Sequence, residues 1–360
     1  MYKVHATLLL LSTYLATSLL HAEATPRGLD AQPKIINGRD ATETQFPWQV
    51  GLVRDIRDIY RSQYCSGTII DARWVLTAAH CVAQEANNTL HVIAGTIDLL
   101  DGTAAQVIAV DQIIIHPQFS NIANSNALNH DIALLRLRTP IDFVNCGQRC
   151  SKIDWLNTQS EVASIQRGTS ALINGWGRTV DCQAESDRCR DLRRTTAGGL
   201  ILSPPRLQWA TVNIDGCLSG SSRHDSAQIT ANMLCAAAPR FTEDTCQGDS
   251  GGGMTITAAD GRGQVLAGIT SWGRGCAQIG FPAVYTRVAR YDQWISNRMA
   301  GRPSSADRQV SNVDNSTFWQ NLNPPRTTSD NSSGGSFGFW GLGLLAGLGL
   351  LRQLRRQRIQ

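Results

Sequence analysis

The sequence predicts an all-β domain that is closed by a single helix near its C-terminal end. From residue 46 onward the chain consists of short apolar runs separated by turn residues, a pattern typical of β-strands, as in residues 90–94, 107–115 and 134–137. Helical spacing is convincing once, where apolar residues lie three or four positions apart: Val288, Tyr291, Trp294, Ile295 and Met299. We therefore expect many short strands followed by one terminal helix.

The cysteines and the N-terminus indicate a secreted protein. All ten cysteines lie within residues 65–276, and an even number in one region indicates disulfides formed in an oxidising compartment. Residues 1–24 combine a basic start at Lys3, an apolar stretch over 8–20 and a small-residue cleavage site ending at Ala24. Because that apolar stretch is too short to cross a membrane, we interpret residues 1–24 as a signal peptide rather than an anchor.

Length and charge fit one folded domain with short ends. The chain has 360 residues and a formal net charge of +4. Residues 1–34 carry three Lys/Arg against two acids, and residues 301–360 carry seven against three, so the remainder holds 23 against 24. This balance argues against a nucleic-acid-binding surface on the folded part.

Three motifs together predict nucleophilic catalysis by a serine. The run Asp244-Thr-Cys-Gln-Gly-Asp-Ser-Gly-Gly252 can supply a nucleophile, backbone donors and a pocket floor. A serine hydroxyl is inert at neutral pH unless a positioned base takes its proton, so Ser250 needs a histidine and an orienting carboxylate. Thr77-Ala-Ala-His80 offers the base and His130-Asp131 offers the carboxylate. A Gly-rich turn beside an ordinary surface serine would explain one motif but not all three in this order.

Over residues 35–300 these motifs resemble the chymotrypsin/trypsin-type (S1) family of serine proteases. The resemblance implies two Greek-key β-barrels with the active site in the cleft between them, His80 and Asp131 on the first barrel and Ser250 on the second. It implies that Ser250 attacks, that His80 acts as base and then acid, and that Asp131 orients the imidazole. The N–H groups of Gly248 and Ser250 would form the oxyanion hole. It implies no cofactor, and we expect no metal site.

The same resemblance implies protein or peptide substrates with Arg or Lys before the cut. Asp244, six residues before the serine, takes the place of the carboxylate at the pocket floor. The walls and mouth of the pocket are implied at four more positions: Ser271, Trp272, Gly273 and Gly275. Ser271 would also brace Asp131. Ala283 departs from the glycine that is usual in trypsins, so its methyl group should narrow the pocket.

Residues 25–34 resemble an activation propeptide. This turn-rich piece ends at Lys34, and cleavage before Ile35 by an activating trypsin-like protease would free an ammonium group. In the family such an ammonium pairs with the aspartate before the serine, here Asp249, and thereby orders the pocket and the oxyanion hole. Asn37 departs from the usual glycine, but asparagine tolerates left-handed backbone well. We therefore expect a zymogen.

Cysteine placement agrees with the family. The resemblance implies three bridges: Cys65–Cys81, Cys217–Cys235 and Cys246–Cys276. Each could contribute about 2 to 4 kcal/mol by restricting the unfolded chain. The other four cysteines allow three connectivities, of which we favour the two local pairs: Cys146–Cys150 and Cys182–Cys189.

The C-terminal region predicts a flexible linker and a sorting tail. Residues 301–333 are polar and rich in Pro, Ser and Asn, which is typical of a linker without a core. Residues 334–360 open with two glycines, continue with an uncharged run and end in a basic cluster. This order resembles the GlyGly-CTERM tails of bacterial surface and secreted proteins, which imply a rhombosortase-like processing enzyme.

The tail also predicts where the protein resides. Its 15 uncharged residues, 337–351, would reach about 22 Å, against a hydrocarbon core of about 30 Å, so a permanent span would be poor. The terminal arginines would stay cytoplasmic. We expect a transient inner-membrane tail and then an extracellular or cell-surface protein. A GPI signal and a weak permanent anchor are the alternatives.

Two other classes of function fit parts of the sequence. A catalytically silent relative of the family would act as a binding module, but no triad or oxyanion residue is missing. A structural cell-surface role is indicated by the tail alone. The segment 178–206 is longer than the family norm, and it could restrict substrates, be cut by the enzyme itself or be a solvated insertion.

Overall fold

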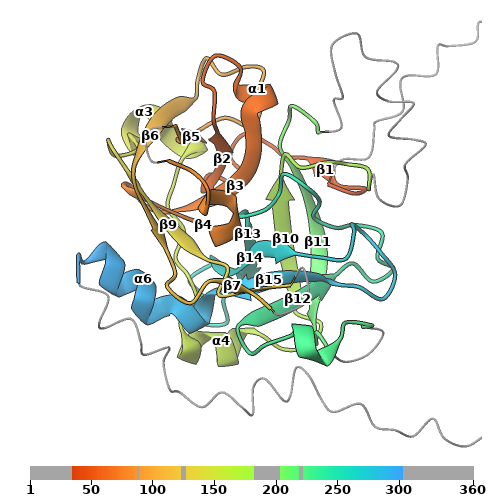
Figure 1. The fold of residues 1–360 in the computed structure, drawn as a ribbon. Coiled ribbons are helices and arrows are strands. Elements are labelled where there is room, and N and C mark those ends of the chain that lie inside the picture. Colours follow the sequence, from red (N-terminus) through yellow and green to blue (C-terminus); the bar gives the residue numbers. More distant parts are fainter. Residues whose placement is uncertain (1–34, 87–88, 123–126, 182–202, 219–221, 303–360) are drawn as a thin grey trace, which may run out of the picture. The chain divides into compact units, whose positions relative to one another are not determined.

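The fold was analysed in a computed structural model of the full chain (Figure 1). It describes residues 35–302 with four gaps, at 87–88, 123–126, 182–202 and 219–221. The predicted signal peptide, propeptide and tail lie outside the described residues, as do residues 303–333 of the linker and the favoured bridge between Cys182 and Cys189. In the described part of the chain, no helix is both long and apolar enough to span a membrane.

The first barrel is closed by six antiparallel strands. They are joined in the order β2-β3-β4-β9-β6-β5, and β5 pairs back onto β2. Register shifts interrupt the ladders between β2 and β3, β3 and β4, and β6 and β9, and such bulges help a sheet to bend into a barrel. The strands are β2 (Gln49–Val53), β3 (Gln63–Asp71), β4 (Trp74–Thr77), β5 (His91–Ala94), β6 (Gln106–Ile115) and β9 (Ala133–Leu137).

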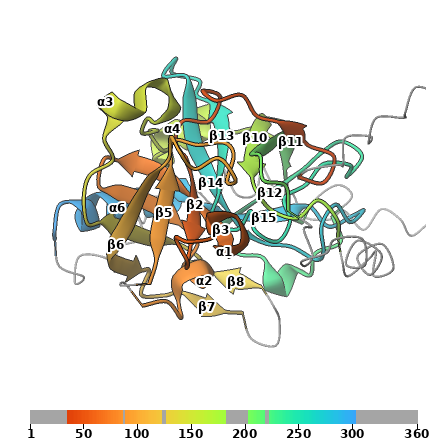
Figure 2. The same cartoon turned by 90° about the horizontal axis from the view of Figure 1, so that it is seen from above.

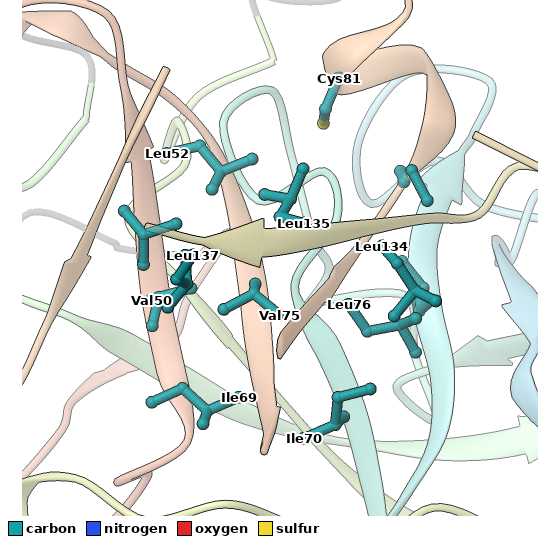
Figure 3. Close-up of a cluster of buried hydrophobic side chains, with 14 of the residues drawn as sticks. Val50, Leu52, Ile69, Ile70, Val75, Leu76, Cys81, Leu134, Leu135 and Leu137 are labelled. Atoms are coloured by element: carbon teal, nitrogen blue, oxygen red, sulfur yellow. The ribbon is translucent and has the colours of Figure 1, made fainter. Parts of the chain in front are cut away.

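Apolar side chains from four of these strands fill the first barrel. Figure 3 shows side chains of this cluster along β2, β3, β4 and β9, with Val50, Leu52 and Val75 in one group, Ile70, Leu76 and Leu134 in another, and Cys81 at the edge. Leu52, Leu76 and Leu134 are fully buried. The three apolar runs predicted to be strands correspond to β5, β6 and β9. Each strand contributes buried apolar residues to this core.

The second barrel is also closed by six antiparallel strands. The ring runs β10-β13-β14-β15-β12-β11, and β11 pairs with β10 to close it. The short strand β1 (Arg39–Asp40) adds to the outside of β11. The ring strands are β10 (Ser170–Gly175), β11 (Gln208–Asp215), β12 (Met233–Ala237), β13 (Gly253–Thr257), β14 (Gln264–Trp272) and β15 (Ala283–Arg287). The prediction of an all-β fold with two barrels is confirmed.

The predicted C-terminal helix is also confirmed. It begins as the 3-10 turn η3 (Val288–Tyr291) and continues as α6 (Asp292–Met299). Tyr291, Trp294 and Ile295 are buried in the core of the first barrel, although the helix follows the last strand of the second. Figure 1 and Figure 2 both show α6 in blue on the side of the first barrel. The helix therefore fastens the two barrels together.

Several short elements were not predicted. All of them have seven residues or fewer, and most are a single helical turn or a two-residue strand, so they contain too few positions for a repeat to be visible in sequence. These elements are α1 (Ile59–Ser62), α2 (Ala79–Val82), α3 (Phe143–Cys146), α4 (Thr158–Ser164), η1 (Gly147–Arg149), η2 (Ser226–Gln228) and the paired strands β7 (Ser120–Asn121) and β8 (Leu128–Asn129). Only α2 among these helices carries a predicted site residue, His80.

Four disulfides join cysteines within the described residues. Three are the bridges that the family resemblance implies, and the fourth is the favoured local pair: Cys65–Cys81, Cys217–Cys235, Cys246–Cys276 and Cys146–Cys150. The first ties β3 to α2 and so holds the helical turn that carries His80.

Candidate active site

The predicted base and its orienting carboxylate lie in contact. His80 is held on α2 directly after β4, and Asp131 lies just before β9, which pairs with β4. The imidazole Nδ1 of His80 is 2.7 Å from Asp131 Oδ2, and the backbone N–H of His80 donates to Asp131 Oδ1 at 2.8 Å. A carboxylate that holds Nδ1–H leaves Nε2 free to accept a proton. This is the geometry that a general base requires.

Strands of the second barrel hold Asp131 in place. Its side chain is only 1% exposed, and Ser271 on β14 donates its hydroxyl to Asp131 Oδ2 at 2.6 Å. Thr286 on β15 donates its hydroxyl to the backbone carbonyl of Asp131 at 2.7 Å. The preceding residue, His130, has a φ of +53°, so the chain makes a strained left-handed turn into the carboxylate. Ser271 therefore braces Asp131 as the sequence predicts, and Thr286 is an additional support.

The loop of Ser250 is fastened to both barrels through its backbone. Its carbonyl accepts from Ser66 N–H of β3 at 2.8 Å, and Gly251 N–H donates to Thr270 O of β14 at 2.9 Å. Within the described residues, no hydrogen bond joins Ser250 Oγ to the ring of His80. The ring Nε2 instead lies 3.8 Å from Cys81 Sγ. A hydrogen bond between a catalytic serine and its base is often long in a protein without substrate, and it tightens when substrate binds.

The predicted oxyanion donors, Gly248 N–H and Ser250 N–H, make no hydrogen bond to another group of the described residues. The intervening Asp249 N–H, by contrast, donates to Cys246 O at 3.0 Å. Gly248 has a φ of +106°, and a Cβ there would lie 2.9 Å from Gly177 Cα. Only glycine fits this position, and the two free N–H groups can bind a developing negative charge.

A pocket of about 200 Å³ adjoins Ser250. Every predicted substrate-binding residue lines it: Asp244, Ser271, Trp272, Gly273, Gly275 and Ala283. Asp244 is 5% exposed, and its two carboxylate oxygens accept from Thr245 N–H at 2.8 Å and Ala277 N–H at 2.7 Å. Burial raises the pKa of Asp244 to about 7, an effect that these two N–H groups oppose. A bound cation would restore the charged carboxylate.

Asp249, the predicted partner of the new N-terminus, is fully buried. Its carboxylate accepts from Gly177 N–H at 2.7 Å and Cys246 N–H at 2.8 Å, while burial raises its pKa to about 6. A Cβ on Gly177 would lie 2.5 Å from this carboxylate, which explains the glycine. Ile35 is also buried, in the core of the second barrel, and the following Ile36 forms a bridge with Asp244.

Three contacts at the site were missed from the sequence. Thr286 supports Asp131 as described above. Asp181, 3% exposed, accepts from Cys276 N–H at 3.1 Å on the pocket wall. Gln63 donates its side-chain amide to Gly248 O at 3.0 Å. None of these residues belongs to a local motif, and only the folded chain brings them to the site.

One cluster within the described residues has the donor atoms of a metal site. It consists of Cys65, His80 and Cys81, whose ligand atoms lie within 4.8 Å of one another. The two sulfurs are joined in a disulfide, so neither can act as a thiolate ligand.

Two closed six-stranded antiparallel barrels followed by a C-terminal helix are the architecture of the chymotrypsin class of serine proteases. Residues 35–295 match the family model described as Trypsin. The chain therefore belongs to the trypsin family.

Two known relatives are similar to this chain. Urokinase-type plasminogen activator from Gallus gallus is 34% identical over 276 residues, a match that covers 74% of this chain and 57% of that protein. This chain thus spans little more than half the length of that relative. Among solved structures it is similar to neuropsin, a serine protease expressed in the limbic system of mouse brain. The TM-score is 0.55 with 31% identity, covering 73% of this chain and 98% of that one.

Proposed function

We propose that this protein is a secreted serine endopeptidase, made as a zymogen, that cleaves protein or peptide substrates after Arg or Lys. The observation that carries the proposal is the buried carboxylate of Asp244 in a pocket that also reaches Ser250. A single acidic group at the end of a narrow pocket selects a long cationic side chain. The scissile bond is then placed at the serine.

The reaction is acyl transfer. His80 takes the proton of Ser250 Oγ as the oxygen attacks the scissile carbonyl, and it then gives that proton to the leaving amine. Asp131 keeps the imidazole in the required tautomer through its 2.7 Å contact with Nδ1 and stabilises the imidazolium. The N–H groups of Gly248 and Ser250 bind the oxyanion. Water then enters, His80 activates it, and the acyl group leaves Ser250 as an acid.

Activation follows cleavage between Lys34 and Ile35 by another trypsin-like protease. The freed ammonium of Ile35 pairs with Asp249, whose buried carboxylate otherwise has only backbone N–H partners among the described residues. Pairing of a buried carboxylate with a cation offsets the cost of its burial, so cleavage stabilises the ordered pocket.

Two measurements test the proposed activity. After trypsin treatment, the wild type should react with a phosphonate that labels active serines, and mass spectrometry should place the label on Ser250. A peptide library should be cut after Arg and Lys. Ser250→Ala is the control for both. Absence of labelling and cleavage in the treated protein would show a binding module instead, and preferred cleavage after Phe or Leu would refute the assigned specificity.

Activation is tested separately with Lys34→Gln. This variant should remain inactive after trypsin treatment, whereas the wild type gains activity and a new N-terminus at Ile35. Full activity in uncleaved wild type would contradict the zymogen.

We also propose that the tail is a surface-sorting signal that is removed in maturation. The order of two glycines, an uncharged run and terminal arginines supports a transient inner-membrane tail that a rhombosortase-like enzyme cuts. Mass spectrometry of the surface enzyme should find a C-terminus near Gly334 or Gly335. Recovery of peptides from residues 355–360 from that same fraction would instead show a retained anchor.

A further inference from the structure

Gln63 makes a hydrogen bond across the barrel junction that no local motif indicates. It is the first residue of β3 in the first barrel, and its side-chain Nε2 donates to Gly248 O of the second barrel at 3.0 Å. The same Nε2 donates to Cys65 O at 2.9 Å. Both hydrogens of the side-chain amide are therefore used, and the amide group links a carbonyl of the first barrel to a carbonyl of the second.

The carbonyl that Gln63 holds belongs to the residue that supplies a proposed oxyanion donor. On its N-terminal side, the peptide between Gln247 and Gly248 is held because Gln247 O accepts from Arg178 N–H at 2.8 Å. C=O and N–H point in opposite directions in a trans peptide, so Gly248 N–H points away from Arg178. On the C-terminal side, the peptide that follows is held by Gln63. Gly248 is thus clamped through both of its neighbouring peptides.

This clamp matters because glycine alone does not fix its own backbone. Gly248 has a φ of +106°. Because glycine has no side chain, its backbone can rotate into other allowed φ/ψ regions unless other groups hold it. Among the described residues, the only other side chain that donates to Gly248 O is Ser66, whose hydroxyl is 3.4 Å away. At that distance the bond is weak, so Gln63 is the stronger side-chain donor to this carbonyl. The Asp249 N–H of the same peptide donates to Cys246 O at 3.0 Å, so Gln63 holds one end of the peptide and the backbone holds the other.

We propose that Gln63 is a positioning residue for the oxyanion hole. By holding Gly248 O, it keeps Gly248 N–H aimed at the site where charge develops on the substrate carbonyl. Donors aligned in advance stabilise the transition state more than the bound substrate, so the effect falls on kcat rather than on KM. The inference deepens the proposed function and rests on it.

The test is Gln63→Leu in the activated full chain, which keeps a branched side chain of similar bulk but removes both donors. Hydrolysis of an arginyl peptide amide should lose about tenfold or more in kcat, while KM changes by less than about twofold. A peptidyl-arginine aldehyde forms a hemiacetal with a serine and places its oxygen in the oxyanion hole, so its Ki should rise by a similar factor. Benzamidine, which occupies only the Asp244 pocket, should bind with unchanged Ki.

A matched control is Gln106→Leu. Gln106 on β6 also donates a side-chain amide to a backbone carbonyl, Asp142 O at 2.8 Å, but at a half-buried position of the first barrel away from the pocket. This variant should leave kcat and the aldehyde Ki unchanged.

The pH dependence of kcat/KM separates this role from an effect on His80. Because Gln63 also donates to Cys65 O, whose disulfide holds the turn that carries His80, a general disturbance would move the apparent pKa of the base. We expect the midpoint of the acid limb to stay in place while the plateau falls.

Unchanged kcat and aldehyde Ki in Gln63→Leu would overturn the proposal, as would a fall in kcat accompanied by a shifted acid limb. If the leucine variant does not fold, Gln63→Met has the length of glutamine, carries no charge and cannot donate to Gly248 O, so the same results apply to it. Failure of the proposed function itself is distinct, because the wild type would then neither hydrolyse the amide nor bind the aldehyde.

Discussion

A buried ion pair should hold the last strand of the second barrel beside the site. Glu161 on α4 and Arg287 on β15 are both 0% exposed. Arg287 Nε and Nη2 donate to the two oxygens of Glu161 at 2.7 and 2.6 Å, and Nη1 donates to Ala231 O at 3.0 Å. Removal of one partner leaves the other charge unpaired in the interior. Each of Arg287→Met and Glu161→Leu should therefore reduce the free energy of unfolding by about 3 to 5 kcal/mol.

Thermal unfolding followed by circular dichroism measures this loss. A domain of this size loses about 2 to 4 °C in Tm per kcal/mol, so each single variant should melt roughly 6 to 20 °C below the wild type. The double variant replaces both charges with apolar groups, so it should lose clearly less than the two singles combined. Arg262→Met, which breaks the partly exposed pair with Asp260 at 2.9 Å, should leave Tm almost unchanged.

The same strand links stability to activity. Thr286, next to Arg287, donates to the backbone carbonyl of Asp131 at 2.7 Å, so a displaced β15 should also lower kcat in variants that still fold. The reasoning is refuted if a single variant melts within about 1 °C of the wild type. It is equally refuted if the double variant loses as much as the two singles together, because the two residues would then act independently.

Three further predictions concern the pocket, the carboxylate and two histidines. Ala283→Gly should raise turnover of at least one basic substrate, because the methyl group lines the pocket; unchanged kcat/KM for both Arg and Lys peptides would contradict this. Ser271→Ala removes the 2.6 Å donor to Asp131 and should lower kcat by about tenfold, and an unchanged kcat would contradict this support of Asp131. His116 and His130 stack at 4.9 Å, and burial lowers both pKa values, that of His116 to about 3. Their neutral forms stabilise the fold above pH 6.5, and this stability should be lost as the pH falls toward 3; a Tm independent of pH over that range would refute the assignment.

The fold could be predicted because its signals are local. Runs such as 107–115 place apolar residues into a core at strand spacing, and the terminal helix shows its period over more than two turns. The left-handed backbone expected at Asn37 is present, with a φ of +57°, and its side chain donates to Thr242 O at 2.6 Å. Elements of four residues were missed because a single turn has no repeat. In α2, for example, the Thr77-Ala-Ala-His80 motif and the Cys65–Cys81 disulfide explain the position of His80 better than any helical pattern does.

The candidate site divides in the same way. His80, Asp131 and Ser250 lie in distinctive short motifs, so the sequence can nominate them, and their catalytic roles stay predictions. Gln63 and Thr286 could not be found, because each is an ordinary polar residue in a strand. Their importance comes from a partner more than 150 positions away in the chain, and sequence spacing carries no information about such a contact.

These distant contacts make each barrel a support for the other barrel's functional group. Asp131 belongs to the first barrel, yet Ser271 and Thr286 of the second hold its carboxylate and its carbonyl. Gly248 belongs to the second barrel, yet Gln63 of the first holds its carbonyl. A small shift of one barrel against the other would therefore misalign the general base and the oxyanion donors at the same time. Because these bonds are short and directional, catalysis should decline before the barrels themselves unfold, and variants at the junction should lose kcat at temperatures where circular dichroism still reports an intact fold.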